Sequence, residues 1–107
     1  MNFINLTPHT IKVLKNDTVF EFPPSGVVAR VLVKITRCEP IDDFKVTKSI
    51  FGEIENLPTP QDDTTYIVSQ MVLGRVKDRS DVVAPDTGLT AIRNEAGQIE
   101  YVSGFVV

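Results

Sequence analysis

The sequence has few of the residues from which metal and redox sites are built. Its 107 residues include one Cys, one His and no Trp. A single Cys excludes an internal disulfide framework and a cysteine-based zinc or iron–sulfur site, and one His leaves no second imidazole for a metal site. We therefore expect neither a metal nor another cofactor, and the sequence predicts no catalytic residue.

Long apolar runs and an excess of positive charge are also missing. No apolar run approaches the ~20 residues of a membrane span, and the first residues are not a charged signal region. The 11 Lys and Arg against 14 Asp and Glu give a net charge of −3, which argues against a general nucleic-acid binder. These features predict a soluble, cytoplasmic protein that does not contact membranes.

The residues that are present favour strands. The chain is long enough for one core, so we expect a single globular domain over residues 1–107, with a radius of gyration near ~13 Å if it folds alone. Apolar side chains alternate at a period of two far more often than at the helical period. The predicted fold is mainly β: a single antiparallel rolled sheet, a small barrel or a sandwich, with one short helix.

Two hairpins are expected, one near each end. Residues 10–15 and 18–22 flank Asn16-Asp17, and both turn residues tolerate the positive φ of a tight hairpin turn. Near the other end, residues 91–93 are expected to pair with a final strand over residues 98–107.

The longest predicted strand covers residues 27–37, followed by a second extended stretch over residues 41–54 with a bulge or bend near Gly52. Alternation in the first strand predicts one buried face. The residues of that face are Ala29, Val31, Val33 and Ile35.

Further elements are shorter. Extended pieces are expected at residues 64–68 and 81–85. Ser69 is placed to cap a helix from Gln70 to about Lys77, with Met71 and Val72 facing the core.

His9 is the only imidazole, and it follows Pro8 in a turn between two apolar strand pieces. It can act as a general base or contact a ligand. Alternatively, the His and Thr side chains of this turn bond to neighbouring backbone, and the sequence leaves both readings open.

The segment from Gly74 to Gly88 is the main candidate for binding, since it places cations, carboxylates and Thr in loop-like sequence. Arg binds phosphate through two hydrogen bonds, while Asp and Thr side chains can form hydrogen bonds with the hydroxyl groups of a ligand. The alternative is a solvated network of ion pairs. Together with His9, the residues predicted to bind a ligand are Arg75, Arg79, Asp81, Asp86, Thr87 and Arg93.

The motif Asn5-Leu6-Thr7-Pro8-His9, with Pro24-Ser25-Gly26, Arg79 before Asp81-Val82, Ala84-Pro85 and Arg93-Asn94-Glu95-Ala96-Gly97, resembles a family of small bacteriophage and actinobacterial proteins. The likeness runs through nearly the whole chain. It brings no established activity and no catalytic residue. It implies a small accessory protein of phage origin in a bacterial cytoplasm.

Three functions follow as hypotheses. The first is a non-enzymatic binding protein that captures a small anionic, nucleotide-like ligand, for example a host immune signal, in a pocket at a homo-oligomer interface. The second is a protein–protein interaction or structural accessory module that uses an exposed strand edge such as Phe105-Val106-Val107. The third is a small hydrolase that uses His9 with a nearby Asp.

Overall fold

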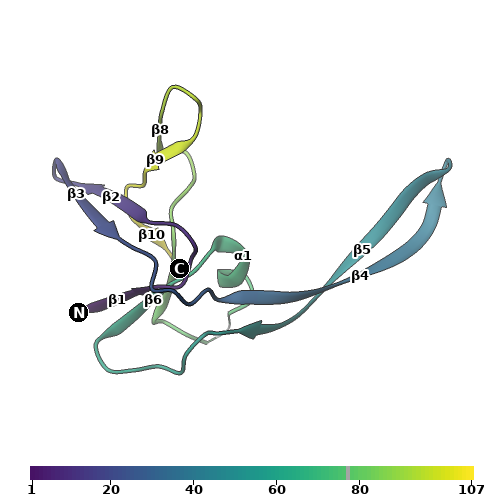
Figure 1. Cartoon of the computed structure of the whole chain (residues 1–107), viewed down its shortest axis with the longest axis horizontal. Coiled ribbons are helices and arrows are strands. Elements are labelled where there is room, and N and C mark those ends of the chain that lie inside the picture. The colour runs from purple at the N-terminus through teal and green to yellow at the C-terminus, as the bar shows by residue number, and fades with distance from the viewer. Residues whose placement is uncertain (77) are drawn as a thin grey trace.

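The computed structural model describes residues 1–76 and 78–107, and it shows a body from which one long hairpin extends as an arm (Figure 1). The prediction of a mainly-β fold with one short helix is confirmed. The strands are β1 (Asn2–Asn5), β2 (Ile11–Lys15), β3 (Thr18–Phe22), β4 (Arg30–Ile41), β5 (Phe44–Glu55), β6 (Thr64–Ile67), β7 (Val82–Pro85), β8 (Ile92–Arg93), β9 (Ile99–Tyr101) and β10 (Phe105–Val106), and the helix is α1 (Gln70–Leu73).

The body is organised around a four-stranded sheet in the order β1-β6-β7-β10. β6 lies parallel to both β1 and β7, whereas β10 is antiparallel to β7. The central sheet is therefore mixed rather than wholly antiparallel as predicted. The physical reason lies in β6 and the residue after it, where Tyr66, Ile67 and Val68 are fully buried, since strands buried on both faces are typical of parallel pairing.

The core packs against this sheet and is small. Its buried members come from the first turn, β6, α1 and β7, and the base of the arm covers one side. They are Leu6, Ala29, Tyr66, Val68, Val72 and Val82.

The first predicted hairpin is confirmed. Asn16 and Asp17 have φ values of 50° and 61°, as a tight turn between β2 and β3 requires. Its cross-strand pairs include Ile11 opposite Phe22 and Val13 opposite Phe20.

The arm consists of β4 and β5, joined by a turn in which Asp42 and Asp43 both have positive φ. The bulge or bend predicted near Gly52 is confirmed as an irregularity in pairing, since the register between β4 and β5 shifts between the Val31–Ile54 and Val33–Phe51 pairs. The buried face predicted for β4 is correct only at its base. Val33 and Ile35 are 47% and 68% exposed, because the hairpin has left the body before it reaches them.

The C-terminal part departs from the predicted hairpin. β8 and β9 pair as expected. The predicted final strand is then interrupted at Ser103-Gly104, and β10 pairs with β7 in the central sheet. The final strand is therefore divided between two sheets.

The helix is shorter than predicted. Ser69 caps α1 as expected by accepting a hydrogen bond from the backbone N–H of Val72, but the helix ends at Leu73 with Gly74 as its C-cap. Val72 is buried as predicted, whereas Met71 is 60% exposed, so its predicted place in the core is wrong. The far end of the predicted helix, Lys77, lies outside the described residues.

Candidate functional site

Arg79 is engaged inside the body rather than presented to a ligand. Its Nε and Nη2 donate to the two carboxylate oxygens of Asp81, both at 2.8 Å, and Nη2 also donates to the Pro58 carbonyl oxygen at 2.9 Å. Both side chains are about four-fifths buried. Hydrogen bonds from Arg79 hold the pKa of Asp81 below its ordinary value, and those bonds to Asp81 raise the pKa of Arg79. The pair therefore ties the 57–63 loop to β7 and neutralises itself.

This geometry sets a pH dependence for stability. Because the folded-state pKa of Asp81 is lowered, the pair stabilises fully above the unfolded pKa of about 3.9 and loses its contribution as the pH falls through the folded value. We expect Asp81→Asn to lower the free energy of unfolding by about 2 kcal/mol at pH 7 and to flatten its decline below about pH 4. Urea unfolding of both proteins from pH 7 to pH 2.5 measures this. Parallel pH curves for the two proteins would contradict it.

The three predicted arginines occupy different surroundings. The Arg75 guanidinium lies 4.1 Å from the centre of the Phe51 ring, at the base of the arm. Arg93 donates to the Gly97 carbonyl oxygen within its own hairpin. The structure therefore gives no shared guanidinium cluster among these residues.

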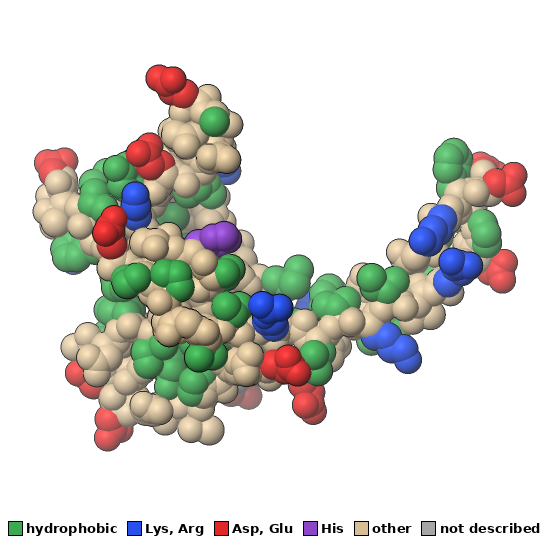
Figure 2. Space-filling model, in the orientation of Figure 1, with side chains coloured by type: hydrophobic (Ala, Val, Ile, Leu, Met, Phe, Trp, Pro, Cys, Tyr) green, Lys and Arg blue, Asp and Glu red, His purple; other side chains and the backbone are tan. Residues whose placement is uncertain are grey.

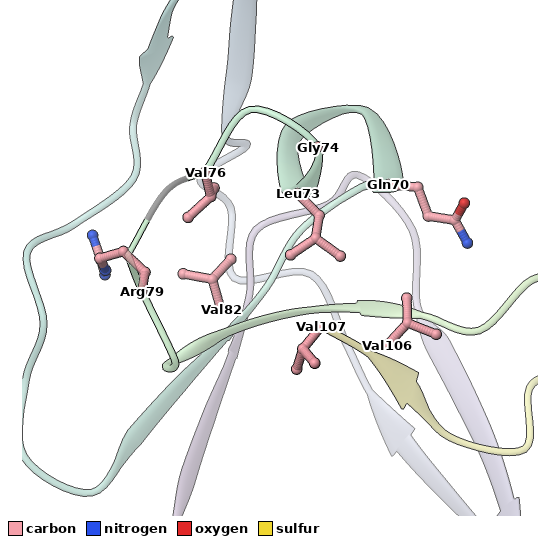
Figure 3. Close-up of a pocket in the computed structure, with 8 residues that line it drawn as sticks. All are labelled: Gln70, Leu73, Gly74, Val76, Arg79, Val82, Val106 and Val107. Atoms are coloured by element: carbon pink, nitrogen blue, oxygen red, sulfur yellow. The ribbon is translucent and has the colours of Figure 1, made fainter.

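A cavity of about 550 Å³ lies between α1, β7 and β10 (Figure 3). Its lining combines valine and leucine side chains with polar surface, and Arg79 lies at its edge with the guanidinium pointing away from the apolar side chains. Its lining residues are Gln70, Leu73, Gly74, Val76, Arg79, Val82, Val106 and Val107. Of the three arginines predicted to bind a ligand, only Arg79 reaches it.

The Asp86 side chain accepts hydrogen bonds from residues of its own turn. One of its carboxylate oxygens accepts from the backbone N–H of Gly88 and the other from the hydroxyl of Thr90, both at 3.2 Å. These contacts shape the loop that follows β7.

The structure does bring together two other predicted residues, His9 and Thr87. Both line a cavity of about 420 Å³, and both also line an adjoining one of about 230 Å³. Gln70 Nε2 donates to the Thr87 hydroxyl at 2.9 Å, which ties α1 to this place. We call the two adjoining cavities the His9 groove.

His9 is held in position by Asn5, which belongs to the motif of the resemblance but was assigned no role of its own. The buried Asn5 amide donates to the carbonyl oxygens of His9 and Phe22 at 2.7 and 2.8 Å. Its oxygen accepts from the backbone N–H and hydroxyl of Thr7 at 2.9 and 2.7 Å. All four hydrogen-bonding positions of the amide are thus used. The Thr7 hydroxyl donates a hydrogen bond to the neighbouring backbone at His9, as the alternative prediction for this turn expected. The exposed His9 imidazole instead lines the groove.

The arm is the most exposed apolar feature of the molecule. Two 12-residue strands reach about 40 Å, and only four of its strand residues are even partly buried. Seven of its large apolar side chains are exposed: Leu32, Val33, Ile35, Ile41, Phe44, Ile50 and Phe51. A two-stranded hairpin with no covering layer is marginally stable in water.

The shaft of the arm, residues 33–38 and 45–50, has one sign of charge. It carries four cations, Lys34, Arg37, Lys45 and Lys48, and no carboxylate. Figure 2 shows basic side chains along the arm, acidic side chains at its tip and near its base, and further acidic side chains around the body. The arm from 30 to 55 has five residues of each sign, so the net charge of −3 belongs to the body.

The size of the surface sets this chain apart from a compact monomer. Its radius of gyration is 16.7 Å, against the ~13 Å predicted for 107 residues folding alone. Its accessible surface is 7834 Å², whereas a compact protein of 11.9 kDa has about 6,000 Å². The predicted radius is therefore wrong, and the arm, as the longest projection from the body, contributes to the excess of roughly 1,900 Å².

Comparisons with protein-family models, curated proteins and solved structures found no match for this chain. In the part of the chain that the structure describes, no helix is long and apolar enough to cross a membrane. Within residues 1–76 and 78–107, no three His, Cys, Asp or Glu side chains are grouped as a metal site would need.

Proposed function

We propose that this chain is a structural accessory module that assembles with further copies of itself through the β4–β5 arm. The observation that carries the proposal is the bare apolar arm. A stable protein interface buries about 800 Å² on each partner. The surface excess of roughly 1,900 Å² is enough for each copy to take part in two such interfaces.

The base of the arm supports self-association as well. Val31 and Ile54 pack against the core cluster, and Val33 and Phe51 continue the same face outward as a cross-strand pair. An apolar face that begins in the core and runs off the body matches a surface that another folded copy would cover.

The edge strand favoured in the sequence analysis supports this role less strongly. β10 is at the edge of the central sheet, but it has only two residues. Phe105 packs its ring against Phe3 and Phe22, with ring centres 5.9 and 5.8 Å apart. The arm offers a much longer free edge and a larger apolar area.

Self-association is tested by sedimentation velocity together with small-angle X-ray scattering. We expect the purified wild-type chain to form oligomers, and Ile35→Asp to be monomeric at the same concentration, because it puts a charge at the middle of the apolar face. Val19→Asp introduces the same charge at an apolar residue off the arm that is 40% exposed, and it is the control. A wild-type chain that stays monomeric at every concentration, with a radius near 16.7 Å, would overturn the proposal.

Capture of a small anionic ligand is a second proposal, supported by the 550 Å³ cavity beside α1, whose volume falls in the range of small-molecule sites. A nucleotide signal is the form that the phage resemblance suggests. The engagement of Arg79 by Asp81 weakens it, since that guanidinium is already neutralised. Isothermal titration with a panel of nucleotides tests it, and the absence of heat for every member would remove it.

A further inference from the structure

The His9 groove has the chemistry of a site for an apolar peptide segment. The larger cavity lies beside Pro8, Ile11 and Pro85, and the smaller one continues past Ile99 and Tyr101. The cavities share His9, Ile11, Pro85 and Thr87, so they form one trough from α1 to β9. Such a trough suits a short stretch of chain with two apolar side chains.

The tip of the arm is such a stretch. Ile41 and Phe44 face each other across the Asp42-Asp43 turn and are 64% and 73% exposed. Phe44 is the most exposed of the large apolar side chains on the arm, and Ile41 and Ile35 follow with similar exposed fractions. The tight turn fixes both side chains in advance, which lowers the entropy cost of binding them.

We propose that the tip of the arm of one copy, Ile41 to Phe44, docks into the His9 groove of a second copy. This inference rests on the proposed self-association and adds its geometry. In this arrangement, each copy inserts the tip of its own arm into a neighbour and binds the tip of another copy's arm in its own groove.

Charge favours this arrangement over pairing of two arms. Lys34, Arg37, Lys45 and Lys48 would face the same charges on a second shaft, and like charges in contact are destabilising. The body carries the net charge of −3 and offers Glu100 in the wall of the groove. A shaft that crosses a neighbouring body therefore meets charges of opposite sign.

The tip is acidic whereas the shaft is basic, and the groove contains a basic side chain that can pair with the acidic tip. Asp42 and Asp43 are at the turn, while Lys12 and His9 line the smaller cavity. Lys12 is held only loosely, 3.9 Å from Glu21, so its ammonium can reach a new carboxylate.

Docking of a tip into a groove elsewhere on the next copy is a heterologous contact. Such contacts produce closed rings or open chains rather than two-fold dimers. We therefore expect oligomers beyond the dimer.

A complementation experiment tests the docking. Phe44→Asp removes an apolar side chain from the tip and keeps the groove intact. Thr87→Arg fills the groove with a long side chain and keeps the tip intact. Both residues are exposed, so neither change is expected to unfold the chain. Each variant alone should sediment as a monomer, and an equimolar mixture should form dimers only, because one intact tip and one intact groove remain.

The outcomes separate this inference from the proposed function. If Thr87→Arg assembles as the wild type does, the groove is not the site, although the arm still mediates self-association. If the wild type is monomeric, both proposals fail. If the mixture of variants stays monomeric while each variant folds normally by circular dichroism, docking of tip into groove is overturned.

Cys38 gives an independent readout because it is the sole cysteine and lies on the arm. A benzophenone maleimide attached there should, after illumination of the oligomer, cross-link to peptides of a second copy. We expect those peptides to come from residues 7–12 and 85–102. Cross-links to residues 30–55 would show arms paired with arms and overturn the inference.

Discussion

Replacing Asn5 with Asp is expected to lower the free energy of unfolding by about 3 to 5 kcal/mol, although the two side chains have nearly the same shape. The buried Asn5 amide group donates to the carbonyl oxygens of His9 and Phe22. In Asp, a carboxylate oxygen would take the place of the NH2 group that faces these two carbonyl oxygens. It could donate a hydrogen bond to neither of them. Small domains have a total stability of only about 5 to 15 kcal/mol, so much of it would be lost.

Urea unfolding at pH 7 measures the effect. Asn94→Asp is the matched control, because the exposed Asn94 uses only its oxygen, which accepts from the backbone N–H groups of Ala96 and Gln98. A carboxylate can accept both bonds, so this control should change stability by less than about 0.5 kcal/mol. Equal losses in the two variants would show that donation by the Asn5 amide does not stabilise the fold.

The Asn5 network also explains how His9 reaches its groove. Asn5 joins the end of β1 to the end of β3 through the Phe22 carbonyl and fixes the turn up to His9. A partial loss of this network should therefore disturb the groove before the rest of the fold.

Local signals in the sequence predicted local structure well. Asn16-Asp17 indicated a turn that depends on two positive φ values, and Gly52 indicated the irregularity in the arm. Ser69 identified the start of α1. In each case the residue type itself determines the backbone conformation, so no distant partner is needed.

Long-range features could not be predicted in the same way. β1 pairs with β6 over Asn2–Thr64 to Asn5–Ile67, and no local pattern encodes a partner about sixty residues away. Alternation in β4 correctly assigned Val33 and Ile35 to one face, but a period of two does not say whether that face is covered. The first strand of the arm was therefore predicted to have one buried face, although most of it is exposed.

The predicted binding residues show the same limit. Arg79 and Asp81 are two residues apart, and their side chains join to each other rather than to a ligand. His9 and Thr87 meet at one groove, although they lie far apart in the sequence. Asn5 was overlooked. The available signal was an Asn two residues before a Thr at a turn, a pattern in which the amide oxygen accepts the following backbone N–H.

Reversing two charges on the shaft is expected to weaken self-association by about 100-fold. Lys34 and Lys48 lie on the same face of the arm, opposite Ile50 and Thr36 respectively. In the variant Lys34→Glu/Lys48→Glu, two cations that would face an acidic neighbouring body become two more carboxylates. Each reversal replaces an attraction with a repulsion, worth about tenfold per site.

The arm itself provides the internal control for this change. The two changed side chains keep like charges, so the repulsion between residues 34 and 48 is the same before and after. Arg37 and Lys45 remain positive and attract the new carboxylates, so urea unfolding should show no loss of stability while the dissociation constant from sedimentation rises. Lys15→Glu reverses an exposed charge beside the β2–β3 turn, off the arm, and should have little effect.

Salt gives the same result by another route. Added sodium chloride screens attraction between exposed charges, so wild-type association should weaken from low to high ionic strength. The charge-reversed variant should instead associate slightly better as salt rises, because salt then screens a repulsion. The same salt dependence in both proteins would mean that the basic shaft does not lie against the acidic body, and contact between copies would then depend on the apolar face alone.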